Sequence, residues 1–134
     1  MKRMHLGLSV ADIDESVEFY TRLFGQPPSL RRGDYAKWML DDPYVNFNIN
    51  AAGDGPVGTV SHLGLQVESN DELDEVRAEW DSRGFERDDQ NDLVCGYQHQ
   101  DKSWVFDPQQ MPWEVFVTHG VRDDYGTNEM PEPR

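Results

Sequence analysis

Cysteine is almost absent from this sequence of 134 residues, because Cys95 is its single thiol. One cysteine cannot form a disulfide within the chain, which fits a reducing compartment. The apolar runs are short, so none reaches the roughly 20 residues needed to span a bilayer. The first residues lead directly into a predicted strand, so we expect no cleaved signal region. These features together predict a cytoplasmic protein.

Positive charge is also scarce. The sequence has 12 lysines and arginines against 26 aspartates and glutamates, a net charge of −14, and lysine occurs only as Lys2, Lys37 and Lys102. This charge argues against nucleic acid and anionic membrane surfaces as partners. An acidic, lysine-poor surface is typical of a halophilic protein, because concentrated salt screens its self-repulsion. An ordinary acidic cytoplasmic protein is the alternative.

A repeat of about half the chain is the most informative feature that the sequence does contain. Residues 4–10 read MHLGLSV and residues 61–67 read SHLGLQV, and both alternate with the period of a strand. Each is followed by an acidic turn and by a run of helical period that ends at Gly25 or Gly84. Such a repeat indicates a duplicated supersecondary unit.

The pattern predicts the order βαβββ in each copy. Asp12 with Glu15 forms a capping box for the first helix, and Asn70 or Asp71 caps the second. The other expected strands cover about 29–32, 35–40 and 44–49, then a short one near Phe85, a long one at about 94–106 and a last one at 113–118. We expect one domain over residues 1–120, with copies at about 3–50 and 59–119, a flexible link at 51–58 and a polar tail at 121–134.

The repeat also places one histidine equivalently in each copy. If a pseudo-twofold axis relates the copies, His5 and His62 face each other. Glu114 lies in the last predicted strand among apolar neighbours, where a carboxylate is costly to bury unless it meets a cation or a strong donor. Two imidazoles and one carboxylate suit non-haem Fe(II) or a Lewis-acid Zn(II). The alternative is two hydrogen-bonded histidines and a glutamate at the rim.

The chain resembles the vicinal-oxygen-chelate superfamily, which includes glyoxalase I, bleomycin-resistance proteins and extradiol dioxygenases. The likeness covers about residues 3–119 and rests on the paired units, on SVEFYTRLFG at 16–25, on SHLG at 61–64, and on Asp107-Pro108 leading to WEV at 113–115. It implies an α+β fold in which two βαβββ units form a cup-shaped, eight-stranded half-open barrel. It also implies a homodimer, with His5, His62 and Glu114 as metal ligands.

Within that superfamily the sequence is most similar to the cadmium-induced and arsenic-resistance group, whose characterised members are Fe(II)-dependent carbon–arsenic lyases. The similarity rests on RMHL at 3–6, residues 45–49, TVSHLG at 59–64, QDKSWV at 100–105 and WEV at 113–115. That group binds arsenic through two adjacent cysteines, which correspond here to Cys95 and Gly96. Because one thiol is missing, the resemblance implies the same fold and metal site but does not imply the same substrate.

The resemblance favours a metal-dependent dioxygenase or lyase that acts on a small molecule, with Fe(II) as the favoured metal and Zn(II), Ni(II) or Mn(II) as others. A binding or resistance protein without turnover is one alternative. A glyoxalase I-like lyase or isomerase is another, although its fourth ligand would come from residues 45–50, which offer only Asn46 or Asn48. No catalytic residue is identified. Substrate-binding candidates are Cys95, Tyr97 and His99, expected on one face of the long strand, and Lys102, while His119 is expected at the surface.

The charge balance predicts how stability responds to salt. The Debye length falls from about 10 Å at 0.1 M to about 3 Å at 1 M salt, so self-repulsion weakens over that range. We expect Tm to rise steadily as KCl is raised from low to molar concentration. Chloride is not strongly excluded from protein surfaces, so screening is the main expected cause. A flat or falling Tm in a calorimetric series would contradict the halophilic interpretation.

Overall fold

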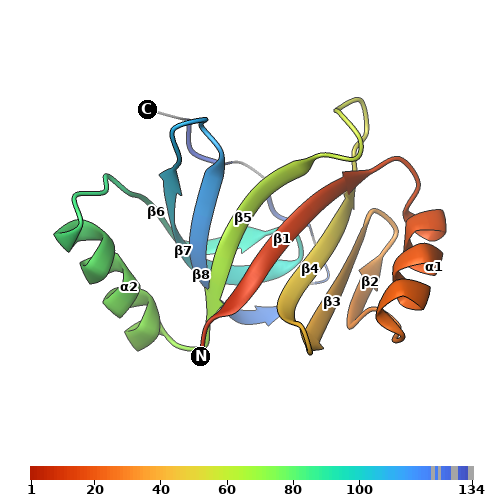
Figure 1. The fold of residues 1–134 in the computed structure, drawn as a ribbon, viewed down its shortest axis with the longest axis horizontal. Helices are drawn as coiled ribbons and strands as arrows, with labels where there is room; N and C mark the ends of the chain where they lie inside the picture. The colour runs from red at the N-terminus through yellow and green to blue at the C-terminus, as the bar shows by residue number, and fades with distance from the viewer. Residues whose placement is uncertain (122, 124, 128–129, 133–134) are drawn as a thin grey trace. The chain divides into compact units, whose positions relative to one another are not determined.

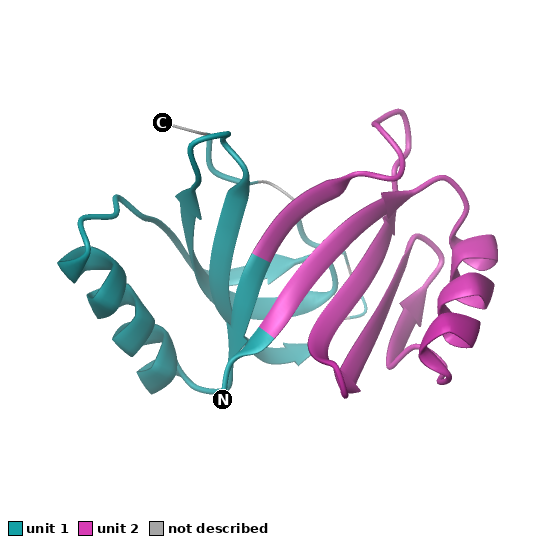
Figure 2. Cartoon of the chain, viewed as in Figure 1, with its two compact units in different colours: residues 1–3, 64–134 teal, residues 4–63 magenta. Residues whose placement is uncertain are grey.

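The computed structural model describes residues 1–121, 123, 125–127 and 130–132. Two helices and eight strands follow one another in the order βαβββ-βαβββ, which confirms the α+β class and the duplicated unit (Figure 1). The chain divides into two compact units (Figure 2). Unit 2 comprises residues 4–63, and unit 1 comprises residues 1–3 and 64–134.

Unit 2 is built around β1, the strand that carries His5. Its elements are β1 (Arg3–Val10), α1 (Ile13–Phe24), β2 (Leu30–Arg32), β3 (Tyr35–Asp41) and β4 (Tyr44–Ala51). β1 runs parallel to β4, while β4 pairs with β3 and β3 with β2 in antiparallel fashion. In this register His5 lies beside Asn46, and Gly7 lies beside Asn48. Alternation then puts Leu6 and Leu8 on the opposite face, against the apolar core.

Helix α1 has the termini that its sequence predicts. The Asp12 side chain accepts a hydrogen bond from the Glu15 N–H at 2.9 Å, and Gly25 ends the helix in the left-handed conformation. Its apolar face packs on the sheet through an aromatic cluster of Tyr20 and Phe24 with Trp38 and Phe47, with ring centres 4.8–6.0 Å apart. Each large side chain buried in this way contributes on the order of 2 kcal/mol.

The glycine-rich link between the copies is tied to β1 by backbone hydrogen bonds. Gly58 N–H donates to the Ser9 carbonyl at 2.7 Å, and Ser9 N–H donates to the Thr59 carbonyl at 3.1 Å. The link leads into β5 (Val60–Val67), of which residues 60–63 belong to unit 2 and residues 64–67 to unit 1. His62 is therefore held in unit 2, together with His5.

Unit 1 contains α2 (Asn70–Ser82), β6 (Asp88–Cys95), β7 (Gln98–Phe106) and β8 (Pro112–Val121). Its strands follow the order β5-β8-β7-β6, and both the β8–β7 and β7–β6 pairs are antiparallel. The predicted cap of α2 was wrong by one residue or more. Ser69, not Asn70 or Asp71, has the extended backbone of a cap and accepts from the Glu72 N–H at 3.2 Å.

The prediction of one long strand from about residue 94 to 106 was also wrong, as was a short strand near Phe85. β6 begins at Asp88 and ends at Cys95, and Gly96 and Tyr97 form a turn before β7. Gly96 has φ +57°, a left-handed conformation that breaks an extended run. Cys95, Tyr97 and His99 therefore surround a hairpin turn and do not share the face of one strand.

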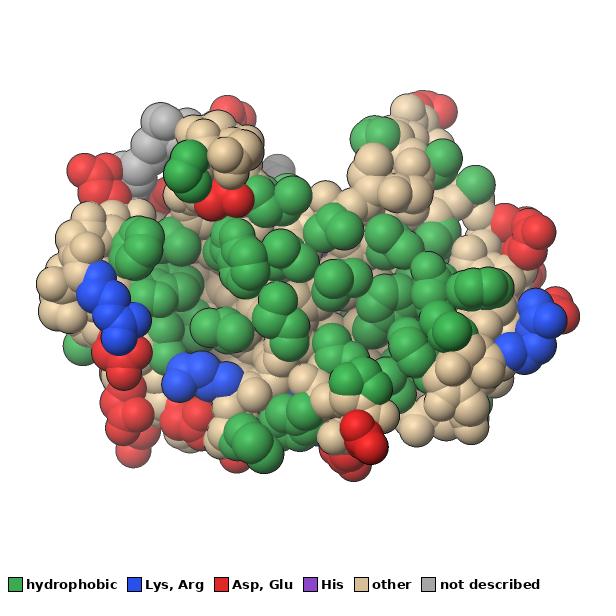
Figure 3. Space-filling model, viewed as in Figure 1, with side chains coloured by type: hydrophobic (Ala, Val, Ile, Leu, Met, Phe, Trp, Pro, Cys, Tyr) green, Lys and Arg blue, Asp and Glu red, His purple; other side chains and the backbone are tan. Residues whose placement is uncertain are grey.

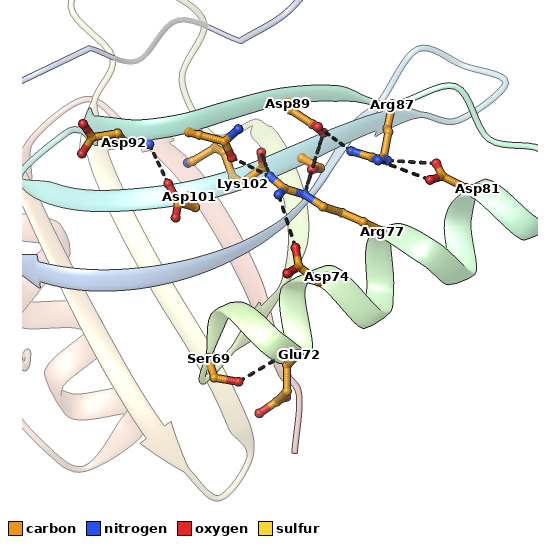
Figure 4. A network of polar contacts seen from close by, with 12 residues as sticks. Ser69, Glu72, Asp74, Arg77, Asp81, Arg87, Asp89, Asp92, Asp101 and Lys102 are labelled. Atoms are coloured by element: carbon orange, nitrogen blue, oxygen red, sulfur yellow. Dashed lines mark hydrogen bonds and ion pairs between the residues drawn. The ribbon is translucent and has the colours of Figure 1, made fainter.

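Arg77 of α2 connects the helix to β7, the strand that carries Lys102 (Figure 4). Its guanidinium donates to the Ser103 hydroxyl at 2.7 Å and to the Lys102 carbonyl at 3.1 Å. It also donates to the Asn91 side chain at 2.7 Å and lies 3.7 Å from a carboxylate oxygen of Asp74. Because several fixed donors of one planar group meet β6 and β7, the backbone at Lys102 is held firmly against α2.

Charged side chains lie near the two helices on the face drawn in Figure 3, where red Asp and Glu side chains stand beside blue Lys and Arg side chains. Hydrophobic side chains gather over β1, where Met4 is 38% exposed and Leu6 and Leu8 are half-buried. Within the described residues, neither helix combines the length and the apolar character needed to cross a membrane.

Candidate metal centre

The structure brings the two repeated histidines together within unit 2. Nε2 of His5 lies 3.0 Å from Nε2 of His62, with ring centres 5.0 Å apart and ring planes at 44°. His5 is only 6% exposed, and His62 is half-buried. The expectation that the two imidazoles face each other is met.

The hydrogen bonds of the two Nδ1 atoms determine whether each facing Nε2 atom carries a hydrogen or a lone pair. Nδ1 of His5 donates to the carbonyl oxygen of Asn46 at 3.1 Å, and a carbonyl can only accept. Nε2 of His5 therefore turns a lone pair toward His62. Nδ1 of His62 is 2.9 Å from the Ser61 hydroxyl, which can accept a hydrogen from it or donate one to it. If the hydroxyl donates, Nε2 of His62 carries the hydrogen and donates it to Nε2 of His5. If the hydroxyl accepts, two lone pairs face each other, and a proton or a metal ion between them relieves their repulsion.

The separation of the two nitrogens suits a bound ion. Two nitrogens that bind one ion at about 2.1 Å and at a right angle are about 3.0 Å apart. A right angle between ligands is the geometry of an octahedral site in which three protein groups occupy one face. The imidazole pair therefore has the spacing of two ligands of a six-coordinate ion.

The third predicted ligand, Glu114, lies on β8 in unit 1 and is 3% exposed. Its Oε2 accepts a hydrogen bond from the ammonium group of Lys102 at 2.9 Å, and Lys102 is itself 1% exposed. The Lys102 nitrogen also lies 5.5 Å from the ring centres of Trp104 and Phe116. A buried carboxylate is thus compensated by one buried cation among aromatic rings.

The ammonium group of Lys102 is charged in this setting. Burial is the largest single effect and lowers the pKa of Lys102, but the charges and hydrogen bonds of Glu114 and Cys95 together outweigh it, and the net shift is upward. The sequence offered two alternatives for Lys102, an anchor for an anionic substrate or a solvated strand end. The side chain lies not in solvent but in the interior, where its ammonium group holds one oxygen of Glu114.

Cys95 lies beside this ion pair. Burial raises the pKa of its thiol, and the nearby Lys102 cation offsets part of that shift. The thiol is therefore protonated at neutral pH until it meets an electrophile or a soft metal. Thr127 forms an isolated β-bridge with Cys95. The Gly96 N–H donates to the Thr127 carbonyl at 2.9 Å, and the Gly96 carbonyl accepts from the Gly126 N–H at 2.7 Å.

The remaining candidates lie at the ends of the strands. Tyr97 packs against Tyr125, with ring centres 5.1 Å apart. The side chains of His99 and His119 are 34% and 31% exposed, so His119 lies at the surface as expected. Asn46 and Asn48, at the position of a fourth ligand, are both buried on β4.

Sequence reasoning missed the function of the glycine in each His-Leu-Gly motif. A Cβ atom at Gly7 would lie 3.0 Å from Cε1 of His62. A Cβ atom at Gly64 would lie 2.6 Å from the Glu114 carbonyl oxygen and 2.8 Å from its Cγ. Each glycine thus makes room for a predicted ligand on another strand. The signal was present in the repeat, because residues two apart on a strand share a face.

Comparison with known proteins shows which family the chain belongs to. Residues 2–115 match the family described as the Glyoxalase/Bleomycin resistance protein/Dioxygenase superfamily. A trivalent organoarsenical cleaving enzyme of Bacillus sp. (strain MD1) is 36% identical over 96% of this chain and 80% of its own length. A cadmium-induced protein of Mycobacterium tuberculosis (strain H37Rv) is 30% identical over 95% of this chain and 83% of its own length.

Solved structures show the same fold. An extradiol ring-cleaving dioxygenase from B. fuscum superposes with a TM-score of 0.63 at 20% identity. The match covers 90% of this chain and 34% of that protein. At this identity the likeness concerns the fold alone.

The close approaches at the two glycines predict a graded loss of stability. Gly64→Ala forces a methyl group against the Glu114 backbone, which cannot move freely, so the free energy of unfolding should fall by about 1–3 kcal/mol. Gly7→Ala meets a side-chain ring and should cost less. Urea denaturation of each variant provides the measurement.

Gly33→Ala is the matched control, because nothing lies within 4 Å of a Cβ atom at Gly33. A Gly64→Ala protein as stable as Gly33→Ala would show that Glu114 is not packed against this strand.

Proposed function

Because the chain belongs to the Glyoxalase/Bleomycin resistance protein/Dioxygenase superfamily, we propose that it is a divalent-metal-dependent enzyme that cleaves a bond in a small molecule. The reaction type is that of a dioxygenase or a lyase. The proposed ligands are His5, His62 and Glu114, each of which offers one nitrogen or oxygen donor.

The facing pair of imidazole nitrogens is the observation that carries this proposal. Their 3.0 Å separation inside one unit, with the His5 tautomer held by a backbone carbonyl, suits two ligands of one ion.

The position of β5 in both units supports Glu114 as the third ligand. His62 and Gly64 are two residues apart on that strand, so their positions share one face. Glu114 packs against that face at Gly64.

Two neutral imidazoles and one carboxylate on one face of an ion are the ligands of non-haem Fe(II) oxygenases, so Fe(II) is the favoured metal. When bound, such an ion supplies Lewis acidity and a place for substrate and O₂. The protein's own contribution is to orient the ligands. Lys102 holds one oxygen of Glu114, and the rings of Trp104 and Phe116 lie beside the ammonium group.

The substrate class follows from the relatives and from Cys95. Proteins 36% identical to this chain are named for cleaving trivalent organoarsenicals. Cys95 and Glu114 both interact with Lys102, so the single thiol of the chain lies next to a proposed ligand. We therefore propose a substrate whose electrophilic or soft atom binds a single thiol, a requirement that differs from the two thiolates that chelate a trivalent organoarsenical.

Metal content tests the proposed ligands. The unmodified protein, purified without chelators and reconstituted with Fe(II) under anaerobic conditions, should bind one ion per chain with high affinity. His62→Ala should lose that ion or bind it much more weakly. Metal analysis and isothermal titration provide the measurement.

Glu114→Gln is the second arm of the test, since glutamine keeps the size of the side chain. It should also weaken binding, by about tenfold or more, and should lower stability because the buried charge of Lys102 then has no counter-charge. Undiminished iron in both variants would rule out the assignment. Tight metal binding without turnover of any compound would instead favour a binding protein.

Arsenic chemistry tests the single thiol. Because Gly96 stands where a second thiolate would complete a chelate, trivalent organoarsenicals should be poor substrates of the unmodified protein. Gly96→Cys should tighten their binding by about tenfold or more, since the second thiol is held beside the first.

Gly96→Ser is the control for backbone strain, because φ at Gly96 is +57° and any side chain there costs about 1–2 kcal/mol. It should bind arsenicals no better than the unmodified protein. Efficient cleavage of trivalent organoarsenicals that persists in Cys95→Ser would contradict the proposed role of the thiol in binding.

A further inference from the structure

A buried row of polar side chains lies along one face of β7 in unit 1. Gln98, Gln100 and Lys102 follow one another at intervals of two residues, so they share a face, and they are 6%, 4% and 1% exposed. The burial of Lys102 is explained by its bond to Glu114. The burial of the two glutamines is not explained by the residues proposed for the reaction.

The hydrogen bonds of Gln100 determine how the Gln98 side chain is oriented. The Gln100 amide nitrogen donates to Oε1 of Gln98 at 3.1 Å and to the Thr118 hydroxyl at 3.0 Å. The side-chain oxygen of Gln98 therefore points toward Gln100. Because the oxygen and the nitrogen of a carboxamide diverge, Nε2 of Gln98 points away from Gln100.

Nε2 of Gln98 is a buried donor without an acceptor. It makes no contact with bulk solvent, and no atom in the part of the chain that the structure describes accepts a hydrogen bond from it. Buried donors are nearly always paired, because an unmade hydrogen bond lowers the stability of the fold. The missing acceptor must therefore come from a bound molecule, which is either a buried water or a ligand.

The single thiol of the chain lies directly opposite this donor. Cys95 pairs with Gln98 across the β6–β7 hairpin. Side chains that oppose each other in an antiparallel pair lie on one face of the sheet, with Cβ atoms about 4.5–5.5 Å apart. The Lys102 cation acts on the same thiol, so Cys95 lies on the side of the sheet that carries the polar row. Cys95 is half-buried, so a small molecule can reach its sulfur.

From this arrangement we propose that Gln98 is a substrate-binding residue. The Cys95 thiol holds the soft or electrophilic atom of the substrate, and the Gln98 amide donates a hydrogen bond to an oxygen attached to that atom. The role of Gln98 rests on the proposed function, because it takes Cys95 as the group that binds the substrate. It narrows the substrate class to molecules whose soft or electrophilic atom keeps a hydroxyl or oxo group after one thiol has bound.

Two phenyl compounds with soft centres distinguish the thiol from the amide. Phenylarsonous acid, PhAs(OH)₂, forms an S–As bond with a thiol, the thiol proton leaves with one hydroxide as water, and the arsenic stays trivalent with one hydroxyl group. Phenylmercuric hydroxide forms an S–Hg bond and releases water in the same way, but no oxygen remains on the mercury. Only the bound arsenical therefore presents an oxygen to Gln98.

Competition with glutathione measures the affinity of the full-length protein for each compound, and no iron is added, so the proposed metal site plays no part. Gln98→Met keeps the length of the side chain and removes the donor. It should weaken binding of phenylarsonous acid by about threefold to tenfold and change binding of phenylmercuric hydroxide by less than about twofold. Gln109→Met, at an exposed position in a turn, is the matched control and should change neither.

Two further variants separate the role of Gln98 from that of the thiol. Gln98→Glu keeps an oxygen toward Gln100 but lacks the amide hydrogens, so it should also weaken binding of the arsenical. Cys95→Ser should lose both compounds, and if it still binds them, the thiol of the proposed function is wrong and Gln98 has no bound atom to act on. If Cys95→Ser loses both but Gln98→Met binds both normally, a buried water alone satisfies Nε2, and the role of Gln98 is overturned. Equal weakening of both compounds by Gln98→Met would overturn it too, because that loss would come from packing around the thiol.

Discussion

The buried ion pair between Lys102 and Glu114 is the interaction on which the packing of unit 1 depends. Both side chains are at most 3% exposed, and their charged atoms are 2.9 Å apart. Removing one partner of such a pair typically costs about 3–5 kcal/mol, because the other charge remains buried without compensation. A well-packed apolar pair would be as stable, so the retention of two charges there is better explained by the ligand function proposed for Glu114.

Several neighbours hold that ion pair in place. Arg77 fixes the backbone of β7 at Lys102 and Ser103, and Gly64 allows β5 to approach the backbone of Glu114. The equivalent glycine of the first copy, Gly7, leaves space for His62. Each copy of the His-Leu-Gly motif therefore supplies one imidazole and, two residues later, a glycine that leaves space for a side chain of the neighbouring strand, His62 in the first copy and Glu114 in the second.

The repeat made much of this predictable. The period of residues 4–10 and 61–67 predicted both strands, and their likeness predicted that His5 and His62 face each other. Asp12 and Gly25 correctly marked the ends of α1. The partnership of Lys102 with Glu114 was not predictable, because it depends on the register of β7 against β8, which pairs Lys102 with Phe116 and Trp104 with Glu114. The hairpin at Gly96 was missed because Cys95, Tyr97 and His99 alternate as strand residues do.

The contacts of Gly126 and Thr127 have a consequence for how copies of the chain meet one another. β6 is the outermost strand of its unit, and such strands offer free backbone groups to other molecules. Thr127 N–H donates to the Val94 carbonyl at 3.0 Å, and Gly96 is bonded on both its N–H and its carbonyl. Gly126 and Thr127 thus cover the C-terminal end of β6, and the N-terminal end of that strand carries the charged residues Asp88 and Asp89. The outer strand of the other unit, β2, is only three residues long. Covered, charged or short edges are poor templates for added strands, so the fold resists the edge-to-edge association that leads to aggregation.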